Sequence, residues 1–148
     1  MTDSNTPLRE APLAERHRAL GASFTDFGGW AMPVRYTSDL AEHHAVRTSA
    51  GLFDISHMAQ FGVGGPDREA FLAYALAFDP SKLALSKAKY TMILAPSGGI
   101  IDDLIVTRNA EDQFLIVANA GNRDAGREAL TERIEGFGAV LVELTDSL

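Results

Sequence analysis

The fold is decided by residues 88–118, AKYTMILAPSGGIIDDLIVTRNAEDQFLIVA, where three apolar runs alternate with two polar turns. The runs are rich in β-branched and aromatic residues, which is typical of strands. Ala95-Pro-Ser-Gly-Gly99 has the residues that a tight hairpin turn requires, and residues 108–112 are a second turn. We therefore expect hairpin-connected strands over 88–94, 100–107 and 113–118.

The flanking segments add helices and two more strands to this meander. Ser38 is a suitable helix N-cap, and Pro66 is suited to the first turn of a helix. We expect helices over 12–21, 38–49, 66–78 and 122–138, and strands over 52–63 and 139–144. Residues 24–36 predict irregular backbone, and the polar residues 1–11 predict a flexible tail. The order predicts an α+β fold, a mostly antiparallel sheet with packed helices, in one domain over 12–148.

Composition excludes several classes of function. The 148 residues carry a net charge of -7 at pH 7 without a Lys/Arg cluster, so we expect no nucleic-acid partner. No apolar run approaches the roughly 18 residues that cross a bilayer, so we expect no membrane partner. The absence of cysteine is compatible with a reducing cytosol, and we expect a cytoplasmic protein.

The histidines do not predict a metal site. His43 and His44 are adjacent, so on a helix their side chains diverge by about 100° and are poorly placed to chelate one ion. The remaining two, His17 and His57, are far apart in the sequence, and no zinc-type spacing is present. We expect no bound metal, and we interpret His57 as a hydrogen-bonded structural residue.

Two adjacent carboxylates, Asp102 and Asp103, are the most informative polar residues. Neighbours on a strand point to opposite faces, so Asp103 shares a face with Ile105, and Asp102 shares one with Leu104 and Val106. A carboxylate on the packed face must find hydrogen-bond donors, because its desolvation is costly. A ligand with basic nitrogens is one partner, whereas in the simpler alternative one Asp caps the turn and the other faces water.

A family resemblance takes the argument further than the residues alone, because five motifs and a shorter sixth occur in order. Together they resemble the N-terminal half of the glycine cleavage system T-proteins, over about residues 7–148. The motifs are Asp26-Phe-Gly-Gly-Trp-Ala-Met-Pro33, Glu42-His-His-Ala-Val-Arg47, Gly51-Leu-Phe-Asp-Ile-Ser-His-Met58, Lys87-Ala-Lys-Tyr90, Gly98-Gly-Ile-Ile-Asp-Asp-Leu-Ile-Val106 and Asn119-Ala-Gly-Asn122.

The resemblance implies an aminomethyltransferase and assigns roles to residues. Such an enzyme transfers a one-carbon unit from the aminomethyl-lipoyl arm of the H-protein to tetrahydrofolate and releases ammonia. Asp103 matches the key acidic residue, which contacts the position-10 nitrogen of the folate and is implied to be catalytic. Met58, Tyr90 and Ile105 match positions that line the folate pocket, and Asn119 matches a polar position near it.

The resemblance also implies what lies beyond this sequence. T-proteins are longer, with three domains around a central folate site, so we expect an incomplete N-terminal folate-binding domain whose partners are the lipoylated H-protein and the remaining C-terminal domains. The alternative from another functional class is a non-catalytic module that binds folate or a protein partner.

Overall fold

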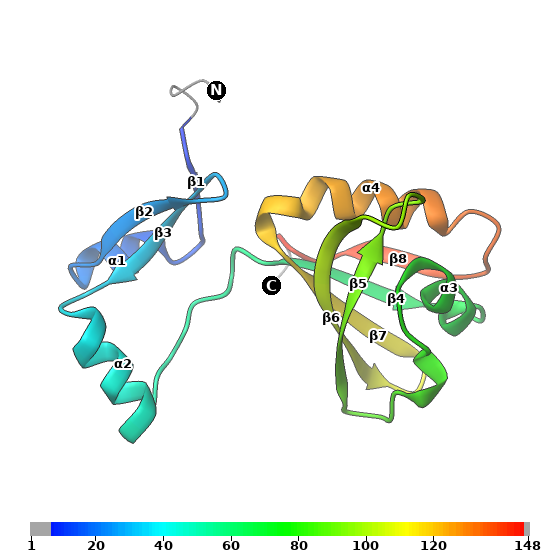
Figure 1. Ribbon diagram of the computed structural model, residues 1–148, viewed down its shortest axis with the longest axis horizontal. Helices are drawn as coiled ribbons and strands as arrows, with labels where there is room; N and C mark the ends of the chain where they lie inside the picture. Colours follow the sequence, from blue (N-terminus) through cyan, green and yellow to red (C-terminus); the bar gives the residue numbers. More distant parts are fainter. Residues whose placement is uncertain (1–6, 147–148) are drawn as a thin grey trace. The chain divides into compact units, whose positions relative to one another are not determined.

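The computed structural model describes residues 7–146, which form two compact units divided between His57 and Met58 (Figure 1). The sequence led us to expect one domain over 12–148, whereas the described residues cluster into these two units. Within the described range, no helix is both long enough and apolar enough to cross a membrane.

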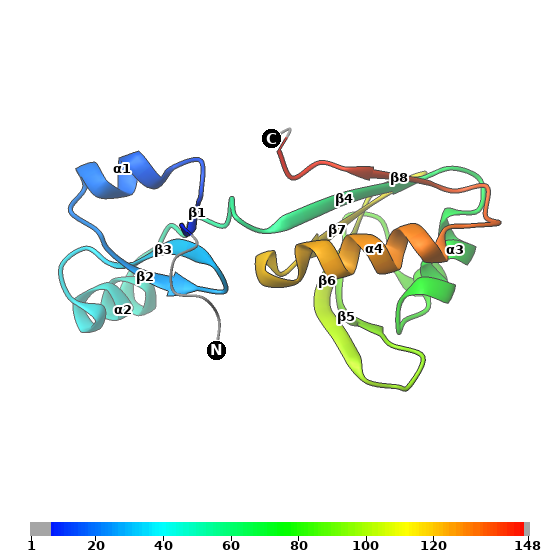
Figure 2. The same cartoon turned by 90° about the horizontal axis from the view of Figure 1, so that it is seen from above.

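The unit 58–148 is a five-stranded antiparallel sheet with two helices. Its sheet order is β5-β6-β7-β4-β8, and the pairing of β4 with β8 brings the first and last strands of the unit side by side (Figures 1 and 2). The strands are β4 Ala59–Gly64, β5 Ala88–Leu94, β6 Ile100–Ala110, β7 Gln113–Ala118 and β8 Val140–Glu143. The helices are α3 Arg68–Ala75 and α4 Arg123–Arg133, with short 3-10 turns η1 Pro80–Lys82 and η2 Ala120–Asn122.

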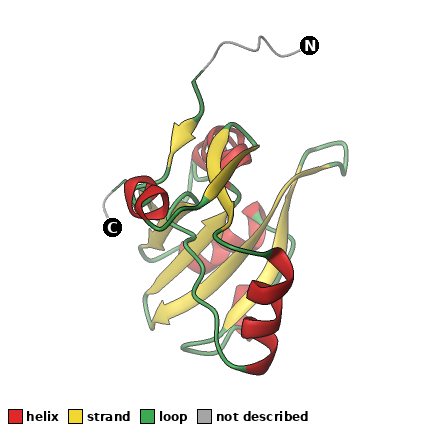
Figure 3. Ribbon diagram, turned by 90° about the vertical axis from the view of Figure 1, so that its left-hand side faces the viewer, coloured by secondary structure: helices red, strands yellow, loops and turns green. Residues whose placement is uncertain are grey.

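The connections of this unit follow the split β-α-β pattern. Strand β7 lies between β4 and β6, and β4 lies between β7 and β8. When the edge strand β5 is left out, the elements follow one another along the chain as β-α-β-β-α-β, which is the ferredoxin-like arrangement. Antiparallel strands, with helices packed on one face of the sheet, confirm the expected α+β class. Figure 3 colours the helices and strands of the chain separately.

Strand alternation gives this sheet one packed face and one open face. On the packed face the core residues of the strands contact those of α3 and α4, and in β4 these are Ala59, Phe61 and Val63. Among the described residues of this unit, no helix covers the opposite face, which exposes apolar side chains, among them Tyr90, Ile105, Val140 and Val142. We call this second surface the open face.

The described residues 7–57 of the smaller unit form a three-stranded sheet, order β1-β3-β2, with two helices and few buried side chains. Its elements are β1 Arg9–Glu10, α1 Ala14–Ala19, β2 Ser23–Phe27, β3 Trp30–Arg35 and α2 Asp39–Thr48. Ser38 caps α2 by accepting a hydrogen bond from Ala41 N, as the sequence predicted. Helix α2 has no buried residue at all.

Several expectations were wrong in detail, and helix α4, expected over 122–138, already ends at Arg133. Residues 24–36 form the β2–β3 hairpin rather than irregular backbone, because Gly28 and Gly29 turn the chain at positive φ. Residues 9–10 pair with β3, so regular structure begins within the expected tail, of which residues 1–6 lie outside the described range. The strand expected over 52–63 begins only at Ala59.

Candidate functional site

Strand β6 places its two adjacent aspartates on opposite faces of the sheet. Asp102 is only 2% exposed and lies on the packed face between the β-strands and the helices. Asp103 is exposed on the open face. The alternation predicted from the sequence is therefore confirmed, and the two carboxylates have different surroundings.

The buried carboxylate of Asp102 is surrounded by nitrogen donors. The backbone N of Asn119 donates to Asp102 Oδ2 over 3.1 Å, and Asn119 Nδ2 donates to Oδ1 over 2.9 Å. Asn122 Nδ2, immediately before α4, donates to the same Oδ1 over 2.7 Å. These three hydrogen bonds offset the desolvation of a buried carboxylate.

The exposed carboxylate of Asp103 is held by a phenol on the neighbouring strand. The Tyr90 hydroxyl of β5 donates to Asp103 Oδ2 over 2.6 Å. In the register of β5 and β6, Tyr90 is opposite Ile105, and Asp103 is opposite Met92, so the bonded pair is diagonal. The hydrogen bond to Asp103 raises the pKa of Tyr90, and partial burial and the negative charges of the two aspartates act in the same direction.

Apolar surface surrounds this polar pair on the open face. Tyr90 is 62% exposed and Ile105 is 43% exposed. Further across the same sheet, a shallow groove of about 340 Å³ is lined by β4, β7 and β8, with Gly62, Leu115 and Val142 among its residues. A flat aromatic ligand can pack on such a surface while a carboxylate accepts its N–H groups.

The structure brings together three of the five residues that the resemblance singled out. Tyr90, Asp103 and Ile105 are neighbours on β5 and β6. Asn119 is attached to them through its Nδ2, which donates to the backbone oxygen of Asp103 over 2.9 Å. Met58 is half-buried directly before β4, and the described contacts do not join its side chain to the other four.

Sequence reasoning did not foresee the role of Asn122. Asn119 and Asn122 are three residues apart across the short turn η2, a spacing that brings both amides to one carboxylate. The signal available in the sequence was a pair of asparagines directly after a strand, at the start of a helix, opposite a buried acid.

A second polar cluster lies within the unit 1–57. His17 Nε2 contacts Asp54 Oδ2 over 2.7 Å, and His17 Nδ1 contacts the Tyr36 hydroxyl over 2.6 Å. The Ser56 hydroxyl donates to Asp54 Oδ1 over 2.6 Å rather than to the histidine. The serine is therefore not activated by the imidazole, and the cluster lacks the connectivity of a nucleophilic triad.

His57 departs from the interpretation of a hydrogen-bonded structural residue. It is 8% exposed, and its buried Nδ1 has no hydrogen-bond partner among residues 7–146. Burial lowers the pKa of His57, although the charge of Asp54 acts in the opposite direction. The ring packs edge-on against Trp30, with 6.2 Å between centroids, so the contact is one of packing.

Comparisons with known proteins agree on one family. The GCVT N-terminal domain matches residues 13–148. Aminomethyltransferases of Cutibacterium acnes and Corynebacterium jeikeium are 49% and 53% identical over 138 and 132 residues, covering 93% and 89% of this chain but 37% and 34% of those proteins. The crystal structure of the glycine cleavage system aminomethyltransferase T from Bartonella henselae matches with a TM-score of 0.89 and 45% identity, over 93% of this chain and 38% of that one.

Proposed function

Because this chain belongs to the GCVT N-terminal domain family, we propose that it is the N-terminal part of a glycine cleavage aminomethyltransferase. The complete protein would transfer the one-carbon unit of aminomethyl-lipoyl H-protein to tetrahydrofolate and release ammonia. Relatives that carry the name aminomethyltransferase support this proposal. The chain spans just over a third of their length, so the activity is proposed for the whole protein.

The observation that carries the proposal is the pairing of Asp103 with Tyr90 on the open face. Tetrahydrofolate has flat rings and N–H groups, and supplies the nitrogens that accept the one-carbon unit. Exposed Tyr90 and Ile105 offer apolar surface to such rings. Among residues 7–146, the described hydrogen bonds of the Asp103 side chain use Oδ2 alone, which leaves Oδ1 to accept from a ligand N–H.

The role that we propose for Asp103 is electrostatic. A carboxylate beside the reacting nitrogen stabilises positive charge that develops as the one-carbon unit is transferred. The hydroxyl of Tyr90 holds this carboxylate in place, so little reorganisation is needed when charge develops. We propose that Ile105 and Met58 provide apolar contact and that Asn119 contributes polar contact near the ring.

The partners follow from the same premise. We propose that the lipoylated H-protein delivers the one-carbon unit and that the remainder of the aminomethyltransferase covers the open face. Exposed apolar side chains along β5, β6 and β8 support the second part, because such surface favours association. We also propose a cytoplasmic location.

The test uses the complete aminomethyltransferase that contains this chain, assayed for glycine cleavage with H-protein and tetrahydrofolate. Replacing Asp103 by Asn keeps the shape and removes the charge, and we expect turnover to fall about 10²–10³-fold. Glu132→Gln, an exposed carboxylate on α4, is the matched control and should leave turnover unchanged. Near-normal activity of the Asp103→Asn enzyme would refute the role proposed for Asp103.

Calorimetry with the 148-residue chain addresses the non-catalytic alternative. A binding module would be favoured if the substitution of Asp103 weakened tetrahydrofolate binding but left the turnover of the complete enzyme unchanged. Loss of both on substitution of Asp103 supports the aminomethyltransferase proposal.

A further inference from the structure

The carboxylate of Asp102 is the most completely bonded acidic group near the candidate site, yet it lies on the opposite face of the sheet from that site. It is 2% exposed and accepts three hydrogen bonds from Asn119 and Asn122. A substrate on the open face cannot touch it, because successive side chains of a strand point to opposite faces. Apart from the weak long-range effect of its charge, Asp102 can influence a reaction there only through another residue.

Asn119 provides the connection between the two faces. One hydrogen of its Nδ2 is donated to Asp102 Oδ1 and the other to the backbone oxygen of Asp103, both over 2.9 Å. Both acceptors are oxygen atoms that cannot donate a hydrogen bond, so the NH₂ group and not the oxygen of the amide must face them. The two donors of this amide are thereby used, so Asn119 cannot donate from its side chain to a ligand without releasing an aspartate.

We propose that Asp102, Asn119 and Asn122 form a positioning cage that fixes the β6 backbone at Asp103 and so directs the Asp103 carboxylate toward Tyr90. Asp102 is the buried anchor, Asn119 carries the constraint to the Asp103 backbone, and Asn122 holds the anchor from the start of α4. The contribution of this cage to one-carbon transfer rests on the proposed function, whereas its effect on Asp103 does not.

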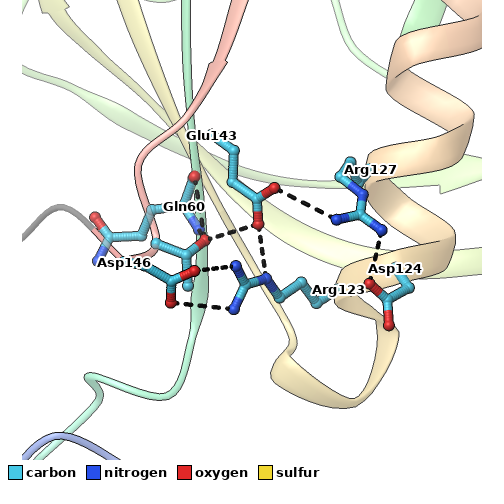
Figure 4. Close-up of polar contacts among 7 residues, drawn as sticks. Gln60, Arg123, Asp124, Arg127, Glu143 and Asp146 are labelled. Carbon is cyan, nitrogen blue, oxygen red and sulfur yellow. Dashed lines mark hydrogen bonds and ion pairs between the residues drawn. The ribbon is translucent and has the colours of Figure 1, made fainter.

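A simpler role for Asn122 would be to attach the beginning of α4 to the sheet. That attachment exists separately, in ion pairs of Arg123 and Arg127 with Glu143 of β8 (Figure 4). Arg123 Nε donates to Glu143 Oε1 over 2.6 Å, and its Nη2 contacts Asp146 Oδ2 over 2.7 Å. These ion pairs already tie α4 to β8 and to the residues that follow it, so the hydrogen bond of Asn122 is not needed for that attachment. We therefore assign the effect of the cage to the geometry at Asp103.

Ionisation of Tyr90 reports the position of the Asp103 carboxylate directly. The hydrogen bond to Asp103 is the main cause of the raised pKa of Tyr90, and a displaced carboxylate would lower it. The charged groups that affect this phenol are Asp103 and, to a smaller extent, Asp102. Variants of the asparagines are therefore preferable to variants of Asp102, because they leave both charges in place.

The experiment is an NMR titration of the 148-residue chain with ¹³Cζ-labelled tyrosine, the Tyr90 resonance being assigned with Tyr90→Phe. Asp103→Asn defines the full loss of the hydrogen bond. We expect Asn119→Ala to lower the Tyr90 pKa by at least half of that change, and Asn122→Ala to lower it by a smaller amount. Arg123→Gln, which removes the Arg123 ion pairs of the separate attachment of α4, should leave the Tyr90 pKa unchanged.

Asn122→Ala keeps the test decisive if Asn119→Ala does not fold, because Asn122 is exposed. A folded Asn122→Ala variant whose Tyr90 pKa equals that of the unaltered chain would overturn the cage. So would an equal shift in Arg123→Gln, since the effect would then come from general loosening of α4. Asn122→Gln, which restores a donor on a longer arm, should recover part of the shift.

Activity measurements separate this inference from the proposed function. In the complete enzyme, we expect Asn122→Ala to lower kcat more than it raises KM, in proportion to the shift in the Tyr90 pKa. If Asp103→Asn retained full turnover, the proposed role of Asp103 would fail while the titration result could stand. If the titration failed and Asp103→Asn was inactive, only the cage would be lost.

Discussion

The two compact units are stabilised by different kinds of interaction. Among the described residues 58–146, the larger unit contains the apolar core, whose sixteen buried side chains come from the four strands β4 to β7, from helices α3 and α4, and from the segment that joins α3 to β5. In residues 7–57, few side chains are buried, and a histidine, an aspartate and a tyrosine are bonded to one another. We infer that apolar burial determines the stability of the larger unit, and that specific polar contacts determine that of the smaller one.

The largest expected effect tests whether apolar burial dominates in the unit 58–148. Phe61 in β4 is fully buried, and Phe61→Ala should lower the free energy of unfolding of this unit by about 3–5 kcal/mol. Phe53 in the other unit is 69% exposed, and Phe53→Ala should change stability by no more than about 0.5 kcal/mol. Urea unfolding followed by circular dichroism measures both, and equal losses would contradict the comparison.

The next effect concerns the polar cluster of the smaller unit. Asp54 is bonded to His17 and Ser56, so Asp54→Asn should destabilise this unit by about 1.5–3 kcal/mol, the range for hydrogen bonds to charged groups. The only tryptophan, Trp30, is buried in the same unit, and its fluorescence during urea unfolding reports the loss. Asp39→Asn is the control, since its contact with Arg35 is exposed and 3.6 Å long, worth about 0.5 kcal/mol or less.

Acid should destabilise the smaller unit in two steps. Burial lowers the pKa of His57 below its ordinary 6.5. The neutral ring therefore contributes fully to the free energy of unfolding above pH 6.5, and this contribution is lost as the pH falls through the lowered pKa. Burial opposes ionisation of Asp54, but the hydrogen bonds from His17 and Ser56 outweigh it and lower its pKa below 3.8. The ionised carboxylate of Asp54 therefore contributes fully to the free energy of unfolding above pH 3.8, and this contribution is lost as the pH falls through the lowered pKa of Asp54.

Fluorescence of Trp30 against pH, at low protein concentration, measures both steps. His57→Gln should remove the first step and leave the second in place. A single transition that His57→Gln does not alter would show that the buried imidazole is not responsible. Amide hydrogen exchange of the β-strands in 58–148 should change less over the same range.

The smallest effect on stability distinguishes the two faces of the larger sheet. Ile105 is 43% exposed on the open face, so Ile105→Thr should change the free energy of unfolding by no more than about 0.5 kcal/mol. Its neighbour Leu104 is 3% exposed, and Leu104→Ala should cost about 2–5 kcal/mol. Under the proposed function, Ile105→Thr should nevertheless weaken tetrahydrofolate binding, which calorimetry on the complete enzyme measures.

Local patterns in the sequence predicted the larger unit better than the smaller one. Strands β5 and β7 have the expected bounds, because apolar alternation and turn residues are both strong there. Strand β6 extends past the expected Thr107 to Ala110, since backbone pairing with β7 continues through polar residues. The β2–β3 hairpin was missed because Pro33 and the two glycines obscured its alternation, although the glycines form its turn.

The sequence likewise predicted some features of the candidate site and not others. Alternation along β6 was enough to assign Asp102 and Asp103 to opposite faces, because this depends only on neighbouring residues. Which partners each carboxylate has depends on β5, β7 and the turn before α4, and sequence spacing does not reveal those contacts. The cage of Asp102, Asn119 and Asn122 therefore became apparent only from the fold.

The open face of the sheet also affects how the isolated chain behaves in concentrated solution. Apolar side chains on that surface attract other copies of the chain, while the net charge of -7 at pH 7 keeps copies apart by mutual repulsion. The repulsion vanishes near the isoelectric point of about 5.0. Precipitation of folded protein, rather than unfolding, should therefore set the lower pH limit for purification and crystallisation.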